Sequence, residues 1–246
     1  MSNNKEELRP GWIVQLDGDE FDLEEWRRAF IEPFDPIAKK IPDGKTVLRC
    51  KDFEIYADAS EVQARALVLV ARLNGALLLA NQTRPVKVAG VSKIDIDGKL
   101  HPWSYAVSIE FECQARDRIT MEVIGPDGLS KATPAPGPSL PQHLNQLAEL
   151  NDVASDLLDH FGRANNWYDI YKTLEFSASL VGSEHKLQVL LGVHASDAKN
   201  LKATANFYRH AKAHRPNNLV SLNEAMTILV IVVRAALSSN DTVEKS

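Results

Sequence analysis

The apolar residues of this 246-residue chain follow two different periodicities, one on each side of a proline-rich stretch. Before that stretch, residues 104–114 (SYAVSIEFECQ) alternate between apolar and polar side chains, which is typical of a half-buried antiparallel strand. Residues 118–125 (RITMEVIG) repeat the alternation, and Asp97-Gly98 between two short runs is a strong hairpin signal. After the stretch, apolar residues recur every three or four positions, as in amphipathic helices. We therefore expect an α+β protein in which a sheet precedes a helical bundle.

The proline-rich stretch itself, residues 125–142 (GPDGLSKATPAPGPSLPQ), predicts a linker. Proline has no backbone N–H and favours extended backbone, so this linker should be partly stiff. We predict an α+β domain with a mostly antiparallel sheet over residues 11–126, a Pro/Gly/Ser-rich linker over 127–141, and an all-α bundle over 142–240.

One long helix is predicted in the first domain, over residues 58–75. Asp58 is suited to cap its N-terminus, and Gly75 is expected to end it, because glycine is the usual residue just past a helix C-terminus. A second, shorter helix should contain three apolar residues at helical spacing: Leu23, Trp26 and Phe30.

Four helices are predicted in the second domain. Ser221 and Glu224 form a capping-box pattern before the last one, whose apolar residues occupy most of its circumference. We therefore expect that helix to be the central and most buried element. The predicted helices cover residues 143–165, 166–182, 196–213 and 221–237. The first of them is expected to end near Gly162.

Composition excludes some classes of protein. The net charge is −5, which argues against a surface coated with nucleic-acid-binding residues but allows one local basic site. Cys50 and Cys113 are far apart and form no Cys-x-x-Cys pair, so a zinc knuckle or dithiol site is not expected. The N-terminus is polar, and the most apolar segment, residues 225–237, contains Arg234 and is shorter than the ~20 residues of a spanning helix. We expect a cytoplasmic protein without a membrane segment.

A basic cluster in FYRHAKAHRPN, residues 207–217, contrasts with the acidic chain. His210 and His214 are four positions apart and would share one face of a helix, as in a two-histidine metal site. Arg209 and His214 would lie roughly 140° apart on an ideal helix. They can act together only where the helix ends, and Pro216 predicts an end at Arg215.

Each pairing in this cluster suits a different chemistry. A guanidinium binds a phosphodiester with two charge-assisted hydrogen bonds and stabilises the charge of a pentacoordinate transition state. A histidine can move a proton to or from a ribose hydroxyl near neutral pH, so Arg209 with His214 suits metal-independent RNA cleavage. Lys212 and Arg215 would add phosphate contacts.

A metal would need a third ligand that no motif supplies, so no metal or cofactor is expected. A basic, solvated helix end remains the simplest alternative.

The residues around this cluster carry a family resemblance. Residues 142–240 resemble the HEPN superfamily (higher eukaryotes and prokaryotes nucleotide-binding domains), whose signature is Arg, a polar residue, a few spacers and His. Here these are Arg209, His210 and His214. A Trp/Tyr-bearing helix precedes them (NNWYDIYKTLE), and a proline and an apolar last helix follow (HRPNNLVSLNEAMTILVIVV). The N-terminal half resembles no family that we can name.

The resemblance implies a metal-independent endoribonuclease with a composite site at a homodimer interface, as in toxin–antitoxin and phage-defence systems. Arg209 would bind the scissile phosphate, His214 would be the acid/base, and His210 would orient it. Asp169 or Glu175 could be the auxiliary polar residue of an earlier helix. The expected partners are RNA, a second copy and an antitoxin or other protein, with no DNA specificity. Some members of the superfamily are not nucleases, so a regulatory or nucleotide-binding module with a ligand- or partner-sensing N-terminal domain is the alternative.

Three histidines and three aromatic residues complete the list of candidates. His101, His143 and His160 stand alone in the sequence and are expected at the surface. The aromatic residues could stack on bases, but their helical spacing favours a core or interface role: Trp167, Tyr168 and Tyr171.

Overall fold

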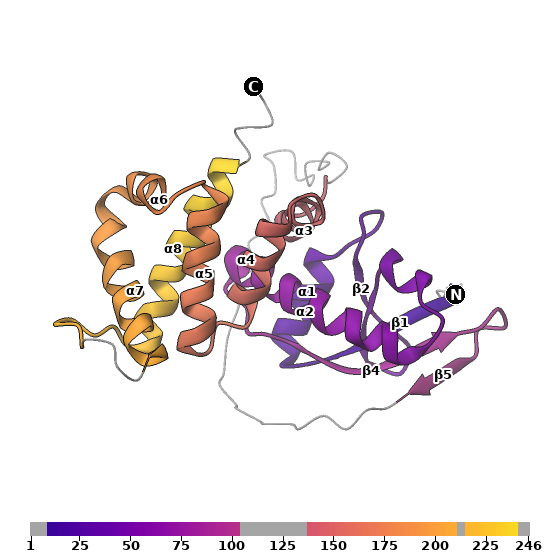
Figure 1. Ribbon diagram of the computed structural model, residues 1–246. Helices are drawn as coiled ribbons and strands as arrows, with labels where there is room; N and C mark the ends of the chain where they lie inside the picture. Colours follow the sequence, from indigo (N-terminus) through magenta and orange to yellow (C-terminus); the bar gives the residue numbers. More distant parts are fainter. Residues whose placement is uncertain (1–8, 104–136, 211–214, 241–246) are drawn as a thin grey trace, which may run out of the picture.

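The computed structural model describes residues 9–103, 137–210 and 215–240. Two bodies lie side by side (Figure 1): residues 9–103, here called the sheet half, and residues 137–240, here called the helical half. The mixed α+β class predicted from the sequence is confirmed. The strands predicted at 104–114 and 118–125, Cys113 and most of the predicted linker lie outside the described residues.

The described strands form an antiparallel sheet in the order β2-β3-β1-β4-β5. The hairpin predicted at Asp97-Gly98 is confirmed, since it joins β4 to β5 and Gly98 takes a positive φ of 75°. The bounds are β1 Gly11–Asp17, β2 Ile37–Lys40, β3 Thr46–Arg49, β4 Lys87–Ile94 and β5 Leu100–Trp103.

Two helices, α1 (Glu20–Ala29) and α2 (Ala59–Asn81), cover one face of the sheet. Alternate residues of β1 contact them, which is the period-two pattern of a half-buried strand. Asp58 caps α2 as predicted, accepting hydrogen bonds from the backbone N–H of Ser60 and Glu61. The residues of this core include Trp12, Val14 and Leu16 of β1, Trp26 of α1, and Val62, Leu69 and Leu73 of α2.

The prediction that Gly75 ends the long helix is wrong, because α2 continues to Asn81. Gly75 lies where α2 crosses α4 (Asp152–Gly162), and a Cβ there would be 2.1 Å from the carbonyl oxygen of Leu158. Gly162 faces it, since a Cβ at Gly162 would be 2.0 Å from the carbonyl oxygen of Ala71. The glycine therefore permits a close helix crossing and does not terminate a helix.

The helical half contains the predicted helices with three differences. The segment 143–165 forms two helices, which meet at Asn151, the N-cap of α4. The helix α6 was not predicted. The third difference, at the end of α7, belongs to the candidate site. The bounds are α3 Leu140–Leu150, α4 Asp152–Gly162, α5 Trp167–Leu180, α6 Glu184–Leu191, α7 Ala195–Arg209 and α8 Leu222–Asn240.

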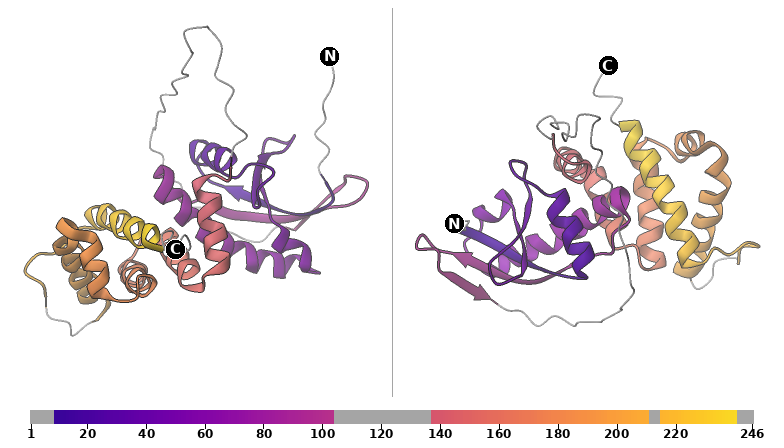
Figure 2. Two further views of the ribbon diagram at one scale, coloured as in Figure 1. Left: turned by 90° about the horizontal axis from the view of Figure 1, so that it is seen from above. Right: turned by 180° about the vertical axis from the view of Figure 1, so that it is seen from behind.

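The expectation that the last helix is the most buried is also wrong. The capping box of Ser221 and Glu224 is present, but α8 lies on the outer side of the bundle when the molecule is seen from behind (Figure 2). Both α2 and α8 are long and apolar enough to cross a bilayer by length and composition alone. In the apolar 18-residue stretch of each helix, however, 61% is buried in α2 and only 33% in α8. The central position belongs to α2, which contributes Ala76 and Leu79 to the core of the helical half.

Candidate nucleic-acid interface

The basic cluster begins at the exposed end of α7. Arg209 is the last residue of that helix, and His210 has extended backbone with φ −121° and ψ 117°. The prediction of a helix up to Arg215 is therefore wrong. After Tyr208 the sequence RHAKAHR holds only alanines as apolar residues, so it offers no large apolar side chain that could anchor a further turn against the bundle. His210 is outside the helix, so the two-histidine helical metal site is lost.

Two stacks join the end of α7 to α5. The rings of Trp167 and Tyr208 are 4.9 Å apart between centroids and nearly parallel, with an interplanar angle of 10°. One turn further along α5, the guanidinium of Arg209 lies 3.8 Å from the centroid of the Tyr171 ring. Trp167 and Tyr171 thus lie in the contact between α5 and α7, in agreement with the core or interface role that their spacing favoured. The cation–π contact holds the guanidinium over the ring.

Arg209 also contacts His210 directly. Its Nε and Nη2 atoms lie 3.3 and 3.0 Å from the His210 Nε2 atom. A guanidinium only donates hydrogen bonds, so Nε2 accepts here and the imidazole carries its proton on Nδ1. The Nη1 group of Arg209 has no partner among the residues that the structure describes, and the side chain is half-buried. Within the described part of the chain, that N–H group is the part of Arg209 left to bind an anionic ligand.

The remaining residues of the predicted motif are only partly described. Arg215 is exposed and lies outside any helix. Lys212 and His214 lie outside the described residues, so the distance from Arg209 to His214 stays a prediction.

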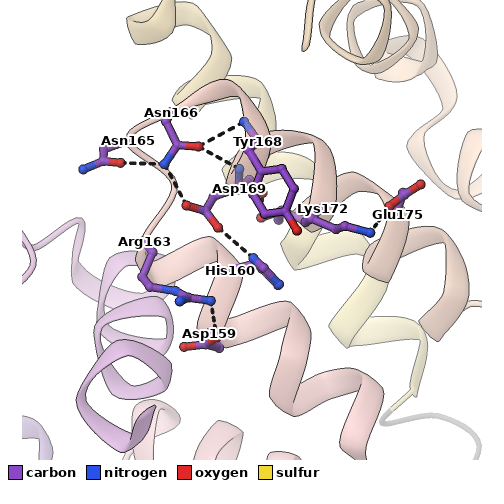
Figure 3. Close-up of polar contacts among 10 residues, drawn as sticks. Asp159, His160, Arg163, Asn165, Asn166, Tyr168, Asp169, Lys172 and Glu175 are labelled. Atoms are coloured by element: carbon purple, nitrogen blue, oxygen red, sulfur yellow. Dashed lines mark hydrogen bonds and ion pairs between the residues drawn. The ribbon is translucent and has the colours of Figure 1, made fainter. Parts of the chain in front are cut away.

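A histidine–carboxylate pair joins α4 to α5 (Figure 3). The Nδ1 atom of His160 is 2.8 Å from Oδ1 of Asp169, and both side chains are mostly buried. Asn166 donates to the second carboxylate oxygen over 2.7 Å, and the His160 ring stacks on Phe176 with centroids 5.4 Å apart. The expectation of an isolated surface histidine is therefore wrong for His160. The two partners are nine positions apart, on either side of the turn between α4 and α5.

This pairing affects the predicted auxiliary residues. Asp169 bonds to His160 and Asn166, and Glu175 accepts from Lys172 over 2.8 Å. No described contact joins either carboxylate to Arg209. In the described part of the chain, both carboxylates are thus engaged by residues of α4 and α5.

A large cavity lies between the two halves. Its volume is about 1100 Å³, and its walls come from α2, the start of β4, the turn between α4 and α5, and the start of α8. Arg163 and Asp169 contribute to its wall. Near it, burial raises the pKa of Asp159 above its usual range, although the neighbouring Arg163 acts in the opposite direction.

Metal binding finds no support in the described part of the chain. No group of three or more His, Cys, Asp or Glu side chains there could hold a metal ion. His101, predicted to stand alone, lies 3.0 Å from Asp95 through its Nε2 atom, within the hairpin between β4 and β5.

Comparison with known proteins gives no match, whether with family models, with curated proteins or with solved structures.

Proposed function

We propose that this chain binds RNA at the end of α7 and cleaves it without a metal ion. The observation that carries the proposal is the guanidinium of Arg209, which lies over the Tyr171 ring at an exposed helix end and has an N–H group without a partner among the described residues. A guanidinium held in this way loses little conformational freedom when it binds a phosphate, so the phosphate is bound in a defined orientation. The resemblance of residues 142–240 to the HEPN superfamily supports the same assignment.

The proposed reaction is a transesterification. His214 accepts the proton of a ribose 2′-hydroxyl, the 2′-oxygen attacks the phosphorus, and the bond from phosphorus to the 5′-oxygen breaks. The leaving oxygen takes up a proton, which gives a 2′,3′-cyclic phosphate and a 5′-hydroxyl. Arg209 stabilises the additional negative charge of the transition state, and His210, which accepts from Arg209, keeps the two groups aligned.

A second copy of the chain completes the site in this proposal. One Arg–His pair supplies a single proton-transfer group, whereas two copies facing each other supply one histidine for each proton transfer. The active form is then a homodimer, and a partner that covers the end of α7, such as an antitoxin, would silence it.

A second candidate function has its own observation. The cavity of about 1100 Å³ between the halves is within the size range of small-molecule sites. It favours a regulatory module in which the sheet half and the helical half together sense a small ligand. The two candidates are separated by whether RNA is cleaved.

The test is cleavage of labelled single-stranded RNA in EDTA. We expect the wild-type protein to produce cyclic-phosphate ends, and Arg209→Ala and His214→Ala to lose about 10²- to 10⁴-fold in rate. Arg28→Ala is the matched control, because Arg28 pairs with Glu24 on the surface of α1 in the sheet half. Intact RNA with the wild-type protein, or equal cleavage by all variants, would refute the ribonuclease and leave the regulatory module.

A further inference from the structure

Tyr208, the residue before Arg209, is exposed over 52% of its surface although its ring stacks on Trp167. We propose that this ring is the platform for the base next to the scissile phosphate, and that the substrate is therefore unpaired RNA. The inference rests on the proposed function and adds the class of RNA on which the site acts.

The first argument is the order of the Tyr208 ring. Trp167 lies parallel to it at 4.9 Å between centroids, and Phe207 meets it at 5.2 Å with an interplanar angle of 67°. Each ring contact restricts the side chain before any ligand arrives. A base that stacks on the open part of the ring therefore orders little of the protein, and most of the stacking energy remains as affinity.

The second argument is position. Tyr208 and Arg209 are consecutive, and their partners Trp167 and Tyr171 are one turn apart on α5. Four residues of helix rise about 6 Å, which is comparable to the reach from a phosphate to a base of the same strand. A guanidinium for the phosphate and a ring for the base thus lie side by side at the end of α7.

The third argument concerns the substrate. In duplex RNA each base stacks between its neighbours, and the narrow major groove excludes side chains, so no base face can reach Tyr208. In single-stranded RNA a base can turn out and stack on a ring. Because every base has such a face, the platform selects unpaired RNA without selecting a sequence.

The test measures binding separately from cleavage. A fluorescently labelled 2′-O-methyl RNA lacks the attacking hydroxyl, so its affinity for the whole protein can be measured by anisotropy in EDTA. We expect Tyr208→Ala to weaken single-strand binding about 5- to 150-fold, and Tyr208→Phe, which keeps the ring, to change it less than about threefold. The blunt duplex of the same sequence should bind more weakly, with an affinity that Tyr208→Ala does not change.

The matched control is Tyr168→Ala. Tyr168 is also 52% exposed, but its ring meets His160, at 6.3 Å between centroids, and not Trp167. Its removal should leave the preference for single strands intact. Equal losses in Tyr168→Ala and Tyr208→Ala, a loss of binding in Tyr208→Phe, or equal affinity for the duplex would overturn the platform.

The outcomes also distinguish the two proposals. Single-strand binding that depends on Tyr208, without cleavage of ordinary RNA, would retain the platform and refute the ribonuclease. Cleavage that depends on Arg209 but is indifferent to Tyr208→Ala and to strand pairing would retain the ribonuclease and refute the platform. Absence of RNA binding by the wild-type protein would refute both.

Discussion

Replacing Gly75 by alanine sets two effects of opposite sign against each other. In an exposed helix interior, Gly→Ala stabilises by roughly 0.5–1 kcal/mol, because alanine loses less backbone entropy on folding. Here the new Cβ would lie 2.1 Å from the carbonyl oxygen of Leu158 and 3.2 Å from the backbone nitrogen of Gly162. Both atoms belong to the backbone of α4 and cannot turn aside. Separating two packed helices costs about 1–3 kcal/mol, so we expect a net loss of about 1–2 kcal/mol.

Thermal and urea denaturation followed by circular dichroism measure this loss. For a chain of this length, 1 kcal/mol corresponds to about 2–4 °C, so the melting temperature of Gly75→Ala should fall by about 2–8 °C. Gly137→Ala is the control, because a Cβ at Gly137 would meet nothing within 4 Å. We expect its stability to stay within about 0.5 kcal/mol of the wild type.

A rise in the melting temperature of Gly75→Ala would contradict the close crossing of α2 and α4, since backbone entropy alone would then account for the result. Gly162→Ala offers a second check, because its Cβ would lie 2.0 Å from the carbonyl oxygen of Ala71. One displacement of the helices relieves both contacts. The double variant should therefore lose less stability than the sum of the two single variants.

Three further predictions concern buried polar groups. The Asn74 side chain donates one hydrogen bond to the Val86 backbone and accepts another from it, each over 2.9 Å. Asn74→Ala should therefore lower the free energy of unfolding, measured by urea titration, by about 2–4 kcal/mol. An unchanged urea midpoint would exclude the two bonds. Burial raises the pKa of the Cys50 thiol, so little reactive thiolate should form in the folded protein. In a Cys113→Ser variant we expect negligible reaction of Cys50 with a thiol reagent at pH 8 and full reaction in urea. Fast reaction of the folded protein would show that Cys50 is accessible. Burial also raises the pKa of Asp159, so the folded state favours its protonated form and ionisation costs stability. Asp159→Asn should raise the melting temperature at pH 7. This difference in melting temperature should vanish below about pH 3, where the aspartic acid of the wild type and the asparagine of the variant are both neutral. An equal difference at pH 7 and below pH 3 would show that ionisation is not the cause.

Features set by neighbouring residues could be predicted from the sequence. The Asp58 cap, the capping box at Ser221, the turn at Gly98 and the helix ending at Gly162 each depend on a few adjacent positions, and each is present. The α+β class followed from periodicity in the same way.

Features set by tertiary contacts could not. Gly75 has the sequence context of a helix stop, and only the passage of α4 explains why it lies inside α2. The pairing of His160 with Asp169 depends on how α4 and α5 meet. The placement of Arg209 on Tyr171 joins residues 38 positions apart, and no local pattern contains that contact.

The part that α2 plays in both cores limits how this chain can be divided. Its residues Leu69 and Leu73 pack with the sheet, while Ala76 and Leu79 pack with the helical half. A fragment beginning at Leu140 would leave the α2-facing side of α4 open to water, and a fragment ending at Trp103 would expose the last turns of α2. The two halves are therefore not independent folding units. A shortened version of the helical half would need a designed replacement for α2.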